Sequence, residues 1–126
     1  MENISPQIII GNCEAEKDNH RGWIIGHFMD KGSLLHSDDL EVKWSKHLKG
    51  EKKLELAKNI QAKTLFILFN GEFRFYFPNE NTDVVLSKEG DYILYDAGVA
   101  HSWEVLEDCC AINIRWPSIA GDQQTV

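Results

Sequence analysis

The sequence predicts an all-β fold, a sandwich or barrel made of many short strands. Segments rich in Val, Ile, Phe, Tyr and Trp recur along the chain, and turn-forming Gly, Pro, Asn and Asp residues separate them. Strands at this spacing are typical of sandwiches and barrels. The three prolines, Pro6, Pro78 and Pro117, lie where strands are predicted to begin or end, which are positions that tolerate proline.

Length and composition favour one folded domain, residues 1–126. The chain has 126 residues, within the roughly 100 to 200 of a typical domain, and its 43% hydrophobic residues are sufficient for a core. Its 20 acidic residues outnumber the 13 Lys and Arg, which gives a formal charge of -7. Because this charge repels phosphate backbones and anionic membranes, we expect no nucleic-acid or membrane partner.

The sequence also indicates a cytoplasmic protein. Its longest apolar run, 65–69, is far shorter than the roughly 20 residues of a membrane-spanning helix. The N-terminal residues 1–10 lack the positive charge and the long apolar stretch of a signal peptide. Cys13, Cys109 and Cys110 are an odd number, and the adjacent pair could join only through a strained ring, so we expect reduced thiols.

The predicted strands are, in chain order, 22–28, 40–47, 64–69, 72–77, 84–87, 91–95, 101–106 and 109–116. The sharpest local signal is Asn70-Gly71 between two apolar runs. A type I′ turn needs positive φ at both central residues, and these two residues tolerate it. We therefore predict a two-residue hairpin between 64–69 and 72–77.

This hairpin would divide the side chains of its strands between two faces. The face expected in the core consists of Thr64, Phe66, Leu68, Phe73, Phe75 and Phe77. The other face carries Leu65, Ile67 and Phe69, which is too apolar for simple exposure to water. We expect an N-terminal strand or a second copy of the chain to cover it, and we predict a homodimer. Alternatively, this face recruits a different protein, and the chain is an interaction module.

One segment favours a helix when it is considered alone. Within 51–62, Leu54, Ala57 and Ile60 would share one helical face. Because the surrounding chain reads as strands, we predict a strand over 53–57 and keep the helix as the alternative.

From Gly90 onward the chain reads GDYILYDAGVAH, ending at His101. This stretch resembles the second motif of cupins: Gly, five residues, usually Pro, one residue, Gly, two residues and His. Gly90 and Gly98 permit the backbone angles of tight turns, and Asp96 stands where cupins usually have Pro. The resemblance covers about 40–117 and implies a cupin double-stranded β-helix, also called a jelly-roll barrel.

Alternation along the strand that follows this motif predicts which side chains enter the barrel. It sends His101, Trp103 and Val105 inward, and it turns Ser102 and Glu104 toward water.

The first cupin motif carries two His and a Glu that bind a metal, and this chain departs from it. Taking Gly71 as the closing Gly of that motif places Thr64 at the position of the Glu, and 56–60 contains no His. Since one imidazole does not hold a divalent ion against water, we predict no metal and no cofactor. The alternative is a divalent metal on His101 and His47. Alternation from Trp44, however, sets His47 on the opposite face unless a bulge intervenes.

Aromatic residues with one titratable group are expected to converge inside the barrel. They are Trp44, Phe66, Phe75, Tyr95, His101 and Trp103, with Thr64 beside them. Small-molecule pockets are built in this way, although such aromatics can also simply fill the core of a small barrel. Asn113 and Arg115 alternate with apolar neighbours, so we expect them to face away from the core. For Arg115 we expect a solvated or interface position, with an anion-binding rim position as the alternative.

These features predict a metal-free, cupin-like protein that binds or senses a small, partly apolar molecule. The alternative is an enzyme, either an isomerase or epimerase that uses His101 as general acid or base, or a metal enzyme with unusual ligands.

Overall fold

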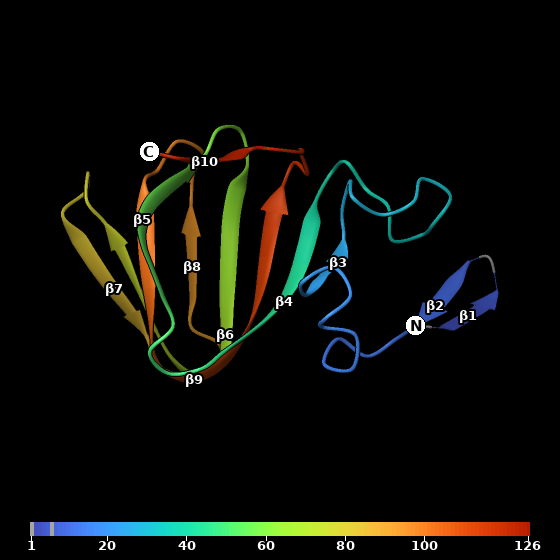
Figure 1. Cartoon of the computed structure of the whole chain (residues 1–126), viewed down its shortest axis with the longest axis horizontal. Coiled ribbons are helices and arrows are strands. Elements are labelled where there is room, and N and C mark those ends of the chain that lie inside the picture. The colour runs from blue at the N-terminus through green and yellow to red at the C-terminus, as the bar shows by residue number, and fades with distance from the viewer. Residues whose placement is uncertain (1, 6) are drawn as a thin grey trace.

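The computed structural model describes residues 2–5 and 7–126, and in this part of the chain it contains ten β-strands and no helix. The strands are β1 (Glu2–Ser5), β2 (Ile8–Ile10), β3 (Trp23–Ile25), β4 (Glu41–His47), β5 (Lys52–Asn59), β6 (Lys63–Phe77), β7 (Thr82–Leu86), β8 (Tyr92–Tyr95), β9 (His101–Trp116) and β10 (Gln123–Thr125). Figure 1 shows strands β3 to β10 curled into an open barrel, which confirms the all-β jelly-roll prediction. No helix of the described residues is long and apolar enough to cross a membrane.

Two long antiparallel strands, β6 and β9, run through the whole barrel and pair along most of their lengths. The first half of β9 lies between β5 and the second half of β6, and this sheet continues outward to β10 and β7. The second half of β9 lies between β4 and the first half of β6, and this sheet continues to β3 and β8. The two halves of β6 and β9 therefore belong to two sheets that enclose the core.

The predicted hairpin at Asn70-Gly71 is wrong, because β6 continues through these residues. Gly71 does adopt a positive φ of 89°. The register of β6 against β9 shifts on both sides of Asn70, so the two residues form a bulged bend where β6 passes from one sheet to the other. The strands predicted at 101–106 and 109–116 are likewise one strand, β9.

The predicted core face is nevertheless buried. Its members are Thr64, Phe66, Leu68, Phe73, Phe75 and Phe77, and none of them exposes more than 6% of its surface. In a regular strand Leu68 and Phe73 would lie on opposite faces, because five positions separate them. The bulges between them bring both to the inside. Leu86, Val105, Cys109 and Ala111 belong to the same buried cluster.

The segment whose local sequence favours a helix forms strand β5, which confirms the predicted strand. Pairing with β9 on one side and β10 on the other outweighs its helical propensity.

One expectation on β9 is wrong: Ser102 is buried, although strand alternation predicted that it faces water. It lies opposite Tyr76 of β6. Cys13, Cys109 and Cys110 are free thiols, as predicted.

The strands β1, β2 and β10 were not predicted. Strand β10 closes one sheet edge by pairing with β5. Strands β1 and β2 pair with each other, and Figure 1 shows this hairpin projecting away from the barrel. Ile8 and Ile10 of β2 are both half exposed. The N-terminal strands therefore do not cover the apolar face of β6 within the same chain.

Candidate binding chamber inside the barrel

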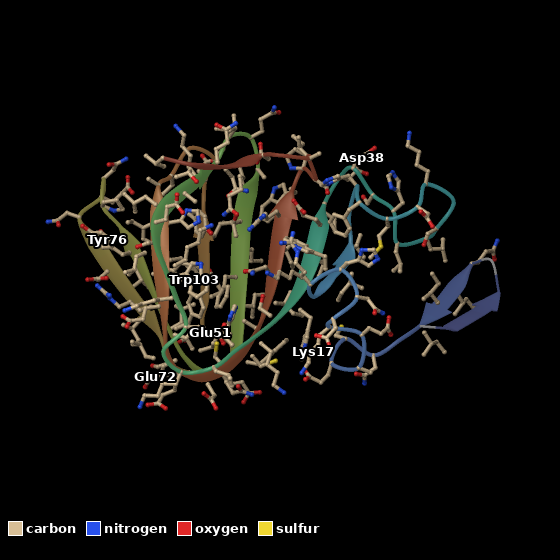
Figure 2. The ribbon with its side chains drawn as sticks, in the orientation of Figure 1. Lys17, Asp38, Glu51, Glu72, Tyr76 and Trp103 are labelled. Atoms are coloured by element: carbon tan, nitrogen blue, oxygen red, sulfur yellow. The ribbon has the colours of Figure 1, made fainter. Side chains whose placement is uncertain are left out.

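A cavity of about 140 Å³, called the chamber below, opens inside the barrel. It is lined by Lys43, His47, Lys53, Thr64, Phe66, Phe73, Phe75, Tyr95, His101, Trp103, Asn113, Arg115 and Gln123. Figure 2 shows Trp103 within the curled sheet and Tyr76 on its outer side. None of the described residues that line the chamber is acidic.

Phenylalanine rings of β6 and Trp103 of β9 form the apolar floor of the chamber. The ring centroid of Phe73 lies 4.6 Å from that of Phe66 and 5.3 Å from that of Trp103. Phe75 lies directly opposite Trp103 across the β6 and β9 pairing. The rings touch one another in tilted geometries, which are favourable for aromatic pairs.

His101 and Tyr95 meet at one side of this floor. Nδ1 of His101 lies 3.0 Å from the carbonyl oxygen of Val99, and Nε2 lies 3.3 Å from the phenol oxygen of Tyr95. A carbonyl only accepts hydrogen bonds, so Nδ1 carries the proton of the neutral ring and Nε2 accepts from Tyr95. Burial lowers the pKa of His101, with smaller contributions from Arg115 and Lys53, and burial raises the pKa of Tyr95. Both groups are therefore uncharged near neutral pH.

Three cationic side chains reach the chamber from three strands: Lys43 of β4, Lys53 of β5 and Arg115 of β9. The indole of Trp23 contacts two of them, with its ring 5.1 Å from the Arg115 guanidinium carbon and 5.6 Å from Lys43 Nζ. Burial lowers the pKa of Lys43, and the positive charges of Arg115, Arg21 and Lys53 lower it further.

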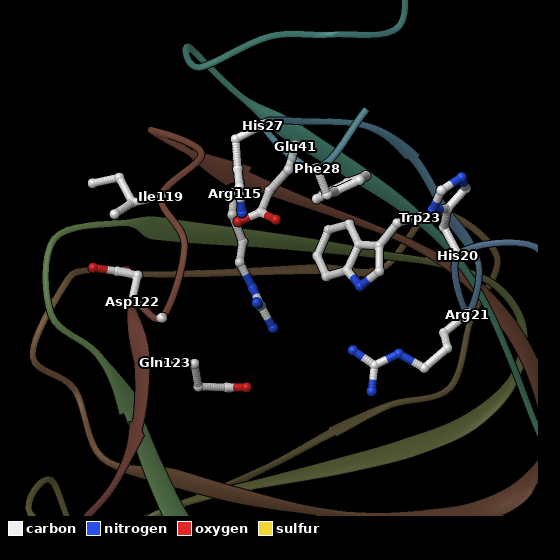
Figure 3. Close-up of a pocket in the computed structure, with 11 residues that line it drawn as sticks. His20, Arg21, Trp23, His27, Phe28, Glu41, Arg115, Ile119, Asp122 and Gln123 are labelled. Carbon is white, nitrogen blue, oxygen red and sulfur yellow. The ribbon is translucent and has the colours of Figure 1, made fainter. Parts of the chain in front are cut away.

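A wider cavity of about 380 Å³, called the mouth, lies against the chamber and shares Arg115 and Gln123 with it. Figure 3 shows the side chains of Arg115, Arg21 and Gln123 directed toward the middle of the mouth. The mouth also contains Glu41 and Asp122. The shared residues place the mouth and the chamber side by side.

His47 lines the chamber, so its expected position on the outer face is wrong. Its ring lies 5.1 Å from that of Trp103, and its Nδ1 lies 3.3 Å from a carboxylate oxygen of Glu51. Alternation correctly put His47 and Trp44 on opposite faces, but the inward face is that of His47.

Trp44 is therefore the one predicted site residue that lies elsewhere. Its indole nitrogen donates to Glu14 at 2.9 Å, and its ring packs 5.8 Å from that of Phe69 on the outer face. The structure brings the other predicted residues together around the chamber: Thr64, Phe66, Phe75, Tyr95, His101 and Trp103.

Sequence reasoning missed the polar wall of the chamber. Asn113 and Arg115 were expected to face away from the core, but both line the chamber, and Asn113 donates to the Ser45 hydroxyl at 3.1 Å. Lys43, Lys53 and Gln123 were not singled out at all. The sequence signal that could have predicted this wall is the alternation of polar and apolar residues over 112–116. Alternation alone, however, does not say which set faces inward.

The residues of the chamber do not fit the divalent metal that a resemblance to cupins implies. Both ring nitrogens of His101 already face hydrogen-bond partners, Thr64 stands at the carboxylate position, and three cations lie nearby. In the described part of the chain, no group of three or more His, Cys, Asp or Glu side chains is placed to hold a metal ion. We derive no chemistry through a metal here.

Comparison with known proteins gives the same fold without a close relative. No protein-family model matches the sequence, and no curated protein matches it either. A Klebsiella pneumoniae protein of unknown function with a double-stranded β-helix domain superposes with a TM-score of 0.61 at 18% identity, over 74% of this chain and 79% of that one. A cupin superfamily protein of Desulfitobacterium hafniense gives a TM-score of 0.55 at 19% identity, over 64% and 69%. A variant of Streptomyces PAC13, determined with uridine, gives 0.61 at 12%, over 71% and 70%.

Proposed function

Because this chain has the cupin fold, the double-stranded β-helix, we propose that it binds a small, partly apolar molecule inside the barrel. The observation that carries this proposal is the chamber itself, which has an aromatic floor, a polar wall and an adjoining mouth. Ligand sites typically combine apolar walls with a few polar groups that fix orientation.

The rival interpretation, in which aromatic side chains simply fill the barrel, is opposed by the size of the chamber. Its volume of about 140 Å³ is many times the roughly 10 to 15 Å³ that a single water molecule needs. Phe66, Phe73 and Phe75 are fully buried, but they form only the floor. The PAC13 variant determined with uridine also supports the proposal, as an example of this fold studied with a small molecule.

The first test is a titration of the full-length protein with benzoate, benzamide and benzyl alcohol, followed by two-dimensional NMR. We expect shifts concentrated at Phe75, Tyr95 and Trp103 with at least one probe. Thr64→Met extends a side chain into the chamber and should reduce these shifts at least fivefold. Leu65→Met, on the adjacent outward position of β6, is the matched control. No shift at chamber residues with any probe would contradict the proposal.

An acid–base enzyme is the second candidate, favoured by the neutral His101 and its contact with Tyr95. A neutral imidazole with an unprotonated Nε2 accepts a proton once the phenol moves aside. The test is exchange of the α-hydrogen of mandelate in D₂O, followed by NMR. Exchange that disappears in His101→Gln would support an enzyme, whereas binding without exchange supports a binding protein.

We also infer a cytoplasmic homodimer. Three free cysteines, two of them buried, suit a reducing compartment. The outer face of β6 is apolar and is not covered by the N-terminal hairpin of the same chain, which supports a second copy as its cover.

A further inference from the structure

The charge of the chamber is opposite to that of the whole chain. The chain carries a formal charge of -7, yet the described residues that line the chamber include Lys43, Lys53 and Arg115 and no Asp or Glu. Each of the three occupies an inward position between outward neighbours. For example, Lys53 lies between the exposed Lys52 and Leu54 of β5. Surface solvation therefore does not explain the cluster.

None of these three cations forms an ion pair with a described residue. The ion pairs of the described residues involve other cationic side chains: Lys17, Lys46, Lys49 and Arg74, together with His36 and His47. The Nε atom of Arg115 is buried and has no hydrogen-bond partner. The Trp23 ring contacts Arg115 and Lys43, but an aromatic face compensates a buried charge only in part. Unpaired charges brought together in a partly buried space repel one another, which costs free energy.

Asp122, which lines the mouth, and Glu51, which contacts the chamber residue His47, are both engaged in other hydrogen bonds. Asp122 accepts hydrogen bonds from the backbone N–H groups of Gln61 and Ala62 at 2.9 and 3.0 Å. Glu51 accepts from the Leu48 N–H and contacts His47.

Glu41 lies opposite Arg115 on the neighbouring strand without forming an ion pair with it. Burial raises the pKa of Glu41, and the positive charge of Arg115 opposes this shift. Glu41 does not line the chamber, where Lys43 and Lys53 lie. Among the described residues, no carboxylate lines the chamber or forms an ion pair with its three cations, so a bound anion would be the first group to pair with them there.

We propose that the ligand of the chamber is an organic carboxylate, whose anionic group binds Arg115, Lys43 and Lys53 while its apolar body lies on the aromatic floor. This inference rests on the proposed function and specifies its ligand class. A planar guanidinium recognises a carboxylate through two parallel hydrogen bonds, and the two ammonium groups add point charges. Asn113 and Gln123 supply neutral hydrogen-bonding groups on the same wall. Inorganic anions lack the apolar body that the Phe73, Phe75 and Trp103 rings would contact.

The test compares two probes of nearly the same shape, benzoate and benzamide, by titration of the full-length protein. We expect benzoate to bind at least tenfold more tightly and its affinity to fall with added salt. Arg115→Gln and Lys53→Met should each weaken benzoate binding at least fivefold and leave benzamide nearly unchanged. Lys52→Met, the adjacent outward lysine of β5, is the matched control and should have no effect. If Arg115→Gln fails to fold, Lys53→Met still tests the inference.

The outcomes separate this inference from the proposed function. Equal binding of benzoate and benzamide at the chamber would overturn the carboxylate inference and leave the proposed function intact. Binding of neither probe would overturn the carboxylate inference, and it would overturn the proposed function as well if benzyl alcohol also failed to bind. Inorganic phosphate that binds as tightly as benzoate would overturn the organic part of the inference. Benzoate binding that is insensitive to both Arg115→Gln and Lys53→Met would overturn the assigned residues.

Discussion

The phenol oxygen of Tyr95, at the end of β8, lies 3.3 Å from Nε2 of His101, at the start of β9. Their rings also pack together, with centroids 4.7 Å apart. The turn between the two strands includes Gly98 of the cupin-like motif, and His101, the last residue of that motif, begins β9. That turn therefore folds back so that one chamber wall holds a buried phenol and a buried imidazole in contact.

The burial of His101 predicts a pH dependence of stability. Its pKa is lowered in the folded state, so the unfolded chain binds a proton more readily. The stability contribution is fully present above the ordinary histidine pKa of about 6.5, and it is lost as the pH falls through the folded pKa. We expect urea unfolding of the wild type to show this loss between pH 7 and 5, and His101→Gln to remove that part of it. His20→Gln, at an exposed site, is the control. Identical pH profiles for wild type and His101→Gln would contradict the prediction.

The bend in β6 predicts an unequal cost for two glycine substitutions. Gly71 and Gly50 both have positive φ, at 89° and 94°. A Cβ on Gly71 would lie 2.1 Å from the Asp108 carbonyl oxygen, whereas one on Gly50 would meet nothing within 4 Å. We expect Gly50→Ala to lower the free energy of unfolding by about 1 kcal/mol and Gly71→Ala by about 3 kcal/mol or more. Chemical denaturation measures both, and equal losses would show that β6 relaxes around the new methyl group.

How far the sequence predicts this fold is clear from β6. Its apolar spacing correctly identified the buried side chains, because burial follows hydrophobicity. It did not show how the segments 64–69 and 72–77 are joined, since the positive φ that Asn-Gly favours suits a bulge within one strand as well as a hairpin turn between two strands. Pairing with β9, a segment far along the sequence, decides between them, and no local pattern contains that information.

The candidate site was predicted only in part, for a related reason. Alternation establishes that Trp44 and His47 lie on opposite faces, but hydrophobicity has to decide which face is inside. In this barrel the outer face is also apolar, and the inner face carries Lys43 and Arg115. The usual rule therefore placed Trp44 inside and Arg115 outside, the reverse of the structure. The exceptions to the rule that charged side chains face outward are Lys43 and Arg115, two of the residues to which we assign ligand binding.

Replacing a chamber lysine by an isosteric apolar residue should stabilise the protein. Lys43 is partly buried near the positive charges of Arg115 and Lys53, and it has no ion pair with a described residue. Removal of its charge relieves repulsion and desolvation, so we expect Lys43→Met to raise the free energy of unfolding by about 1 kcal/mol. The same variant should bind benzoate less tightly. Lys52→Met should change neither quantity. A Lys43→Met protein that is less stable than the wild type would contradict the prediction.

The outer face of one sheet presents two apolar rows that cross four strands. Cross-strand pairing puts Leu94, Leu65, Ile114 and Val42 in one row and Tyr92, Ile67, Ile112 and Trp44 in the other. Leu94 and Tyr92 expose more than half of their surface, at 57% and 61%.

Because an apolar area of this extent is rare on a free surface, we predict that a second copy covers it. Light scattering coupled to size-exclusion chromatography should give twice the mass of one chain for the wild type and the mass of a single chain for Ile67→Lys. Leu54→Lys, at an exposed leucine of β5, is the control and should remain a dimer. A wild-type protein with the mass of a single chain would contradict the homodimer and would favour a different protein as the occupant of this face.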